Sequence, residues 1–380
     1  MSTAMHRTLS LGLVLALAAC SNPRTSARSI RIEELPRRGA DASSILRGRV
    51  LGFDPREHRV AGYVHVEGAG WWSKPVDGDP AAPIAPDGSF SMRVVDGGLD
   101  EYASIHAVAV VPIESTPPLA RGTARIPAEL ASLAMDAKTS FRRTLRFSGR
   151  TWGVKEAPRP VGPGGNRFSS DERDVYVDER GRLHLSVRRR GDVWCASEVV
   201  LLERVGFGTY SIQTDSRLDV LDPRLTFGAF LWDSYGDDTS DNPHREIDFE
   251  DTRWGDATKT TSSQFVVQPF PAPEHLQRYG LPDLTSDARV TRVFEWSPDH
   301  VRFTAARGHH SVRSIPAALV FASYEYARAA ERPVPTAGRE QFRINLWMNS
   351  TELGGASPPA PPAAEVEVVV TAFEFVPAAR

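Results

Sequence analysis

The sequence from residue 145 to residue 377 is dominated by short segments in which apolar and polar residues alternate. In one of them Leu183, Leu185 and Val187 occupy one parity and polar residues the other, the pattern of a half-buried strand. The predicted strands are 183–188, 193–202, 208–217, 226–232, 245–251, 264–268, 290–296, 301–305, 318–326, 341–348 and 365–375. So much strand signal, with 29 Gly and 29 Pro in the chain, argues against a helical fold. We predict an all-β protein whose residues 145–380 form a two-sheet antiparallel jelly roll with a concave cleft.

A smaller β-unit is predicted over residues 42–114. Its expected strands, 47–51, 58–66, 89–95 and 103–111, are separated by turn signals such as Asp87-Gly88. Short strands at this spacing indicate a small N-terminal β-sandwich. Residues 115–144 are expected to be a linker with a short helix over 128–134. Trp71-Trp72 either fills the core of this unit or forms a platform for sugar rings, and the core is favoured.

The N-terminus is typical of an export signal. A positively charged start precedes an apolar run from Leu9 to Ala19, which is too short to span a bilayer. The run ends Leu17-Ala18-Ala19-Cys20, which resembles the bacterial lipoprotein processing box. We therefore expect residues 1–19 to be removed, Cys20 to be lipidated, and residues 20–41 to tether the protein to the cell envelope. In a Gram-negative host the resemblance implies the outer membrane.

Charge and composition exclude some partners. Lys and Arg number 45 and Asp and Glu 48, so the net charge is −3 and nucleic acid is not expected as a partner. After residue 20 no stretch approaches the length of a membrane span. Lipidation of Cys20 would leave Cys195 without a disulfide partner. We expect a monomer held at the membrane only by its lipid.

The strongest functional signal is the segment His244 to Asp251, which reads HREIDFED. On a strand, Glu246, Asp248 and Glu250 point one way and the two apolar residues between them point the other. Arg245, the only cation next to this motif, falls on the opposite face. Three unneutralised carboxylates on one face destabilise an ordinary strand, so the pattern indicates a functional site.

Carboxylates in this pattern suit glycoside hydrolysis. Four residues of strand cover roughly 13 Å, and two outer Glu side chains that lean inward can approach the spacing used by retaining glycosidases. Asp248 lies between them and can retain a proton, since close like charges cannot all ionise. A calcium site and an ion-paired surface strand are the alternatives. Calcium ligands usually come from loops, so a bound calcium is not indicated and no cofactor is expected.

The motif Glu246-Ile247-Asp248-Phe249-Glu250 resembles the catalytic signature of glycoside hydrolase family 16. Other segments come in that family's order: 162–166, 208–210, 230–232, 264–265 and 345–347. The resemblance covers about residues 148–377 and implies a jelly roll that cleaves β-1,3 or β-1,4 linkages. It implies that Glu246 is the nucleophile, Glu250 the acid/base and Asp248 their assistant. The segment 241–244 and the insertion around Trp254 depart from the family's pattern, which leaves the substrate open.

Parity and resemblance also predict the residues that bind substrate. Asn345 and Trp347 share a face, and an aromatic ring beside an amide suits a sugar. The full predicted set is Asn166, Trp232, Trp254, Gln264, Gln268, Asn345 and Trp347. Together these signals predict a lipid-anchored, retaining endo-glycosidase acting on a polysaccharide, with transglycosylation as a further possibility. The alternative is a surface carbohydrate-binding protein on the same fold that does not turn substrate over.

Overall fold

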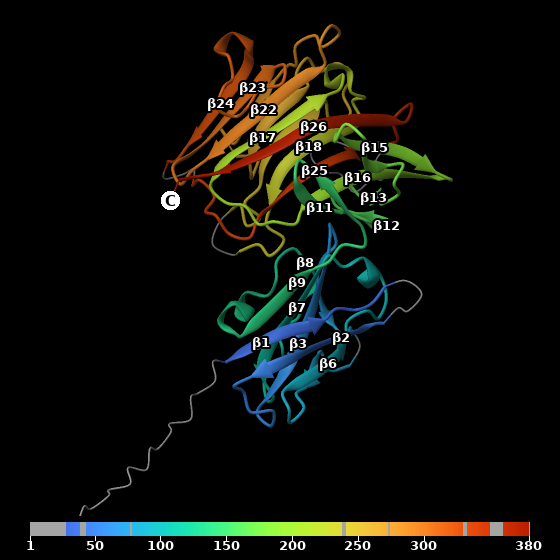
Figure 1. Ribbon diagram of the computed structural model, residues 1–380, viewed down its shortest axis with the longest axis vertical. Helices are drawn as coiled ribbons and strands as arrows, with labels where there is room; N and C mark the ends of the chain where they lie inside the picture. Colours follow the sequence, from blue (N-terminus) through green and yellow to red (C-terminus); the bar gives the residue numbers. More distant parts are fainter. Residues whose placement is uncertain are drawn as a thin grey trace, which may run out of the picture.

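The computed structural model describes residues 28–38, 43–76, 78–237, 241–272, 274–329, 333–349 and 360–379. Within them the chain is almost entirely β-structure, which confirms the predicted fold class. Its helical elements are 3-10 turns: η1 (Asp100–Tyr102), η2 (Ala128–Ser132), η3 (Leu218–Val220) and η4 (Ala317–Leu319). No helix in this part of the chain is long and apolar enough to cross a membrane. Figure 1 shows the N-terminal strands gathered in one lobe and the C-terminal strands in a larger one.

The larger lobe contains two antiparallel sheets. The front sheet runs in the order β10 (Thr144–Phe147), β11 (Arg150–Val154), β16 (Val193–Leu201), β25 (Gln341–Met348), β18 (Leu225–Trp232), β19 (Ile247–Thr252), β20 (Ser263–Val267) and β21 (Leu276–Tyr279). The back sheet runs in the order β14 (Val175–Val177), β15 (Leu183–Arg190), β26 (Val366–Pro377), β17 (Gly208–Asp215), β22 (Arg289–Trp296), β23 (His300–Arg307) and β24 (Val320–Ala327). β15 pairs with β16 and so joins the two sheets at one end.

The core lies between these sheets and is rich in aromatic side chains. Phe249 of β19 contacts Phe294 and Phe303 of the back sheet, with ring centroids 5.2 and 5.9 Å apart. Alternate residues of every front-sheet strand enter this core, as Phe342, Ile344 and Leu346 of β25 do. The residues of opposite parity therefore face outward, across the other surface of the front sheet. The arrangement is the predicted jelly-roll sandwich.

The smaller lobe contains two sheets as well. One has the order β8 (Arg121–Thr123), β4 (Gly70–Lys74), β3 (His58–Val66), β7 (Ile105–Pro112) and β9 (Met135–Thr139), with β5 (Ala81–Pro83) paired to β3. The other has the order β1 (Ser29–Glu34), β2 (Ile45–Leu51) and β6 (Ser89–Arg93). A shared apolar core, which includes Ile32, Val64 and Phe90, fills the space between them.

The boundaries of this lobe differ from those predicted. β1 lies inside the expected tether, because Ile30 and Ile32 are buried in the lobe's core. β8 and β9 lie inside the expected linker, where they pair with β4 and β7. The helix expected over 128–134 is only the 3-10 turn η2. Cys20 and the predicted signal lie outside the described residues.

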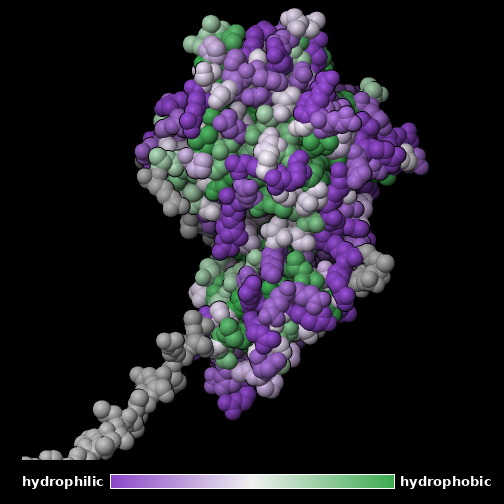
Figure 2. Space-filling model, in the orientation of Figure 1, coloured by the Kyte–Doolittle hydropathy of each residue, from purple (hydrophilic) through white to green (hydrophobic). Residues whose placement is uncertain are grey.

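The two lobes are packed against each other through buried side chains. Trp71 of β4 is fully buried, and its ring lies 5.3 Å from that of Tyr235, which follows β18. Tyr235 thereby completes an apolar cluster of the small lobe that includes Leu130 and Ile105. Figure 2 shows hydrophilic side chains over much of the visible face of both lobes, with apolar side chains between them. Trp71 fills the junction between the lobes and is not an exposed platform.

Candidate active site

Strand β19 and the residue before it carry the three predicted carboxylates on the outward face of the front sheet. Ile247 and Phe249 are buried in the core, so Glu246, Asp248 and Glu250 face the other way, as alternation predicted. Glu246 begins this run directly after Arg245, whose φ of 56° turns the backbone. The Arg245 guanidinium pairs with Asp233 and Asp237 instead, and leaves the three carboxylates without its charge.

Strand β20 and the residue after it provide polar partners for two of these carboxylates. Gln264 Nε2 donates to Glu250 Oε2 at 2.5 Å, and Gln268 Nε2 donates to Asp248 Oδ2 at 3.3 Å. Both glutamines are predicted to bind substrate, and the structure places each beside a carboxylate of the row. A neutral amide stabilises a carboxylate by a hydrogen bond but does not cancel its charge.

Burial therefore controls the ionisation of the cluster. It raises the pKa of Glu246 to about 8, with a further rise from the charge of Glu250 and an opposing effect of Arg343. It raises the pKa of Glu250 to about 7, against the hydrogen bond from Gln264. The pKa of Asp248 is raised as well, by burial first and then by the charges of both glutamates. The cluster holds protons at neutral pH, and Asp248 is the member with both other carboxylates beside it.

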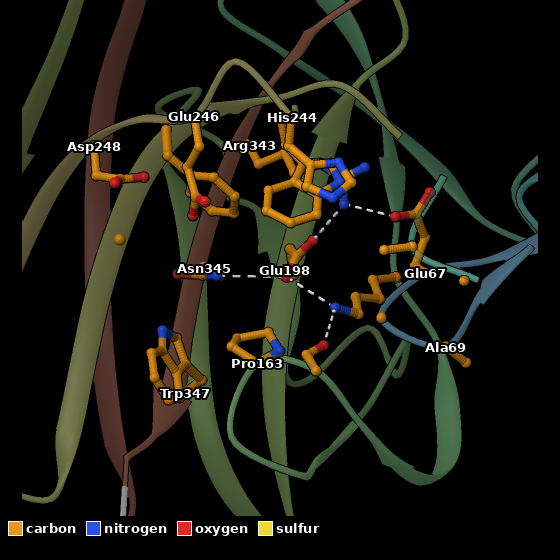
Figure 3. A pocket seen from close by; sticks show the side chains of 18 of the residues that line it. Glu67, Ala69, Pro163, Glu198, His244, Glu246, Asp248, Arg343, Asn345 and Trp347 are labelled. Atoms are coloured by element: carbon orange, nitrogen blue, oxygen red, sulfur yellow. Dashed lines mark hydrogen bonds and ion pairs between the residues drawn. The ribbon is translucent and has the colours of Figure 1, made fainter. Parts of the chain in front are cut away.

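A second group of charged side chains lies two to three strands away on the same face. Arg343 of β25 pairs with Glu198 of β16 at 3.0 Å and with Glu67 of the small lobe at 2.6 Å. Lys155, which follows β11, pairs with Glu198 at 3.1 Å. Figure 3 shows this group on one side of the pocket and Glu246 and Asp248 on the other. We call these four residues, Glu67, Lys155, Glu198 and Arg343, the charge network.

A pocket of about 440 Å³ separates the carboxylates from the charge network. Its lining comes from the front sheet, from the loop at Gly162-Pro163 and from the small lobe. Asn345 lies on its floor and donates to Glu198 at 3.4 Å, while its Oδ1 has no hydrogen-bond partner among the described residues. Gly228 lies beside that oxygen, and a Cβ there would come within 2.5 Å of it. That oxygen is itself buried, so Asn345 forms part of the pocket's floor without exposing this acceptor.

Aromatic rings border the same pocket. Trp232, at the end of β18, stacks on His244 with ring centroids 4.0 Å apart, and both line the pocket. Trp347 also lines it, although most of its surface is buried against Phe168 and Ala196. Flat rings at the border of a polar pocket suit the apolar faces of sugars.

Two predicted binding residues have other positions. Trp254 lies behind Trp347, with ring centroids 6.0 Å apart, and its indole donates to Gln264 at 3.4 Å. Asn166 is buried and ties its loop to β25: Nδ2 donates to the Met348 carbonyl and Oδ1 accepts from the Met348 amide. Because its amide is used in this way, Asn166 supports the loop that carries Pro163 and does not bind substrate directly.

Sequence reasoning missed several residues that line this pocket. Arg343 has the parity of Asn345 and Trp347, and that pattern is sufficient to find it. His244 directly precedes the carboxylate motif. Glu198 requires the register of β16 against β25, in which it pairs with Asn345. Glu67 lies in the other lobe and carries no signal in the sequence.

The described residues include no group of three or more His, Cys, Asp or Glu side chains placed to hold a metal ion. His309 and His310 hydrogen-bond to backbone carbonyls of Thr214 and Arg307.

Comparison with known proteins gave matches only among solved structures. No family model and no curated protein matches the chain. A Bacillus licheniformis β-glucanase is 14% identical, with a TM-score of 0.43 over 59% of this chain and 91% of that one. A lichenase from a mouse hindgut metagenome is 16% identical, with a TM-score of 0.42 over 61% and 96%. An immunostimulatory antigen and pseudo β-1,3-glucanase of Mycobacterium tuberculosis is 17% identical, with a TM-score of 0.43 over 60% and 91%.

Proposed function

We propose that the protein is a retaining β-glycosidase that cleaves β-1,3 or β-1,4 linkages in a polysaccharide. The observation that carries the proposal is the row of three carboxylates that face the pocket, with Asp248 buried and Glu246 and Glu250 half-buried, and with no ion pair to a cation among the described residues. A structural role would favour neutralisation, as in the charge network beside it. Carboxylates with raised pKa values in a pocket are typical of acid–base catalysis.

The proposed reaction is a double displacement. Glu250 donates its proton to the glycosidic oxygen while the carboxylate of Glu246 attacks the anomeric carbon and forms a glycosyl ester. Glu250, now ionised, removes a proton from water, which attacks the same carbon and releases Glu246. A sugar hydroxyl in place of water would give transglycosylation. The chemistry uses only side chains of this chain and requires no metal or cofactor.

The proton distribution limits this reaction. The mechanism needs an ionised Glu246 and a protonated Glu250, and burial raises the pKa of both groups. The two groups interact, so their protons are lost in two steps that belong to the pair. Activity should therefore rise toward neutral pH, as Glu246 loses its proton, and fall again as Glu250 loses its own.

A non-catalytic carbohydrate-binding protein is the second candidate. The observation that favours it is the same raised pKa of Glu246, because a protonated nucleophile does not attack. The rings of Trp232 and His244 in the lining of the pocket serve binding equally well. The two candidates differ only in turnover, so an activity assay separates them.

Reducing-end assays on laminarin, mixed-linkage glucan, agarose and carrageenan provide the first test. Once a substrate is identified, the turnover of Glu246→Ala should be lower by about 10⁴-fold or more. Azide should restore turnover, with a glycosyl azide of inverted configuration as the product. Glu250→Ala with azide should give the azide of retained configuration. The control is Glu325→Ala, which removes an exposed glutamate of the back sheet and should leave the rate unchanged. Binding without new reducing ends would support the second candidate.

We further propose that the protein is a lipoprotein of the cell envelope, with its lipid on Cys20, and that it acts as a monomer. Cys20→Ala should remain unprocessed or leave the membrane fraction. Normal processing and fractionation of that variant would contradict the anchor.

A further inference from the structure

The turn between β3 and β4, residues 66–70, reaches from the small lobe into the pocket of the large one. We call it the hairpin tip. Glu67, Gly68, Ala69 and Gly70 all line the pocket together with residues of β16, β25, β18 and β19. These four strands are neighbours in the front sheet, so the pocket runs across the strands. The hairpin tip stands at the end of it that lies over β16 and β25.

One rim of the pocket is joined directly to the hairpin tip. The Gly68 carbonyl accepts from the Gly162 amide at 2.9 Å. Gly68 has a φ of +74°, and a Cβ on it would lie 2.2 Å from the Gly162 carbonyl oxygen. Only glycine allows this approach, which leaves no gap for a sugar between tip and rim.

The residue after the tip is joined to the segment that follows β18. Trp71 Nε1 donates to the Ser234 carbonyl at 2.7 Å, and the indole is fully buried there. Ser234 follows β18 and so lies at the other end of the strands from Gly162. The hairpin is therefore attached to the large lobe at both ends of these strands.

Between these two attachments, the charge network joins the hairpin tip to the floor of the pocket. Glu67 is buried, pairs with Arg343 at 2.6 Å and accepts from Ser104 Oγ at 2.5 Å. The Arg343 guanidinium holds the pKa of Glu67 well below its usual range, against burial, so the contact is ionic. Figure 3 shows Glu67 directed at Arg343 across the pocket from Asp248. The contact with Gly162 at the rim, the ion pair with Arg343 at the floor and the attachment after β18 make the hairpin tip a wall across the pocket.

The wall stands close to the carboxylates. Arg343, which binds Glu67 of the wall, pairs in register with Phe230, and Phe230 pairs with Asp248. Two strand spacings, or about 10 Å, therefore separate Arg343 from Asp248. That distance leaves room for a short piece of glycan on this side, whereas a continuing chain would meet Glu67 and Gly68.

We propose that the hairpin tip makes the site act on the ends of glycan chains. The inference rests on the proposed glycosidase function and replaces the endo mode of cleavage that the sequence predicts. The substrate is a β-linked glycan with a free end that enters the pocket until it meets the wall. Cleavage then occurs a fixed distance from that end and releases small products of one length.

The product pattern of the wild-type full-length protein tests the proposal. On the polysaccharide that it cleaves, we expect reducing ends to accumulate while viscosity falls little, with one short product from the earliest time points. A rapid loss of viscosity with products of mixed length would overturn the wall and leave the glycosidase function standing. No reducing ends on any of the four polysaccharides would instead remove the glycosidase function and the inference with it.

A substitution on the tip provides the second test. Ala69 is half-buried and lines the pocket, so Ala69→Trp should fill the space before the wall and raise KM at least tenfold, or shorten the product. The control is Val76→Trp, at an exposed site of the same lobe, which should change neither. If the Ala69→Trp protein folds and has the KM and the products of the wild type, the hairpin tip does not contact the substrate and the inference is wrong. If that variant does not fold, the product pattern of the wild-type protein is sufficient to test the proposal.

Discussion

The pocket contains two groups of buried carboxylates that differ in their counter-charges. In the charge network, Glu67 and Glu198 face Arg343 and Lys155, so two negative charges meet two positive ones. In the carboxylate row of β19, three acids lie together and accept hydrogen bonds from two amides. Arg343 and Arg278 act on the two glutamates by their charge, without an ion pair to the row among the described residues. The pKa of Glu67 is lowered, whereas the pKa values of Glu246, Asp248 and Glu250 are raised.

The difference separates a structural group from a reactive one. Buried charges that are paired are stable in their ionised form and hold two lobes in register. Buried acids without cations retain protons near neutral pH and can exchange them with a substrate. Location in the pocket therefore does not distinguish the two groups, because both line the same pocket. The ion pairs do, since among the described residues the charge network forms them and the carboxylate row does not.

The largest effect is expected from breaking the charge network. Arg343→Met leaves Glu67 and Glu198 with Lys155 as their only cation, and should lower the free energy of unfolding by about 3–5 kcal/mol. Chemical denaturation measures the loss. The matched control is Arg302→Met on the back sheet, whose ion pair with Glu295 is exposed and should contribute about 1 kcal/mol or less. Equal losses in the two variants would show that the network does not stabilise the junction.

A smaller effect is expected at Asp248. Burial, and then the charges of the two glutamates, raise its pKa, so we expect Asp248 to hold a proton in the resting site and Asp248→Asn to substitute one neutral group for another. We expect kcat to fall by about tenfold while both limbs of the pH–rate profile stay in place. Asp248→Leu, which removes the polar group, should cost about 10²-fold or more. If the alkaline limb of Asp248→Asn moves to lower pH, Asp248 was ionised and raised the pKa of Glu250 by its charge.

The smallest effect is expected when one glutamate of each group is replaced by glutamine. The resulting change in the free energy of unfolding at pH 8 should have opposite signs in the carboxylate row and in the charge network. The folded-state pKa of Glu246, about 8, lies above the unfolded value near 4.5, so its contribution to stability is full below pH 4.5 and lost as the pH rises through 8. Glu246→Gln should therefore be more stable than wild type at pH 8, and about equal to it at pH 4.5.

Glu67→Gln provides the contrast. Its pKa is lowered in the folded state, so the ionised form contributes stability above pH 4.5 that is lost as the pH falls. This variant should be less stable than wild type at pH 8. Thermal unfolding at the two pH values measures both variants, and shifts of the same sign would contradict the distinction between the groups.

The sequence was sufficient to predict the jelly roll and the carboxylate row, because both depend on alternation within single strands. Strand β25 was predicted with its observed bounds, since its apolar residues alternate with Arg343, Asn345 and Trp347. The polar strand β9 lacks such a pattern and was read as linker. The alternation in β1 was present, but the surrounding Ser, Arg and Pro residues indicated a tether.

The wall could not be predicted from the sequence. Glu67 and Arg343 are 276 residues apart, and the pairing depends on how the two lobes pack. Glu198 was missed for a related reason, since only the register of β16 against β25 brings it beside Asn345. Local patterns therefore indicate the chemistry, while contacts between distant segments determine the shape of the pocket.

Trapping the glycosyl-enzyme tests the central claim, that the unpaired acids of β19 carry out catalysis. An activated 2-deoxy-2-fluoro glycoside of the sugar identified by the assays should form a slowly hydrolysed ester with the nucleophile. Peptide mapping by mass spectrometry should place the label on Glu246 in the wild-type protein and in Glu67→Gln, and find none in Glu246→Gln. A label on Glu67, Glu198 or any residue outside β19 and its preceding Glu246, or steady turnover by Glu246→Gln, would contradict it.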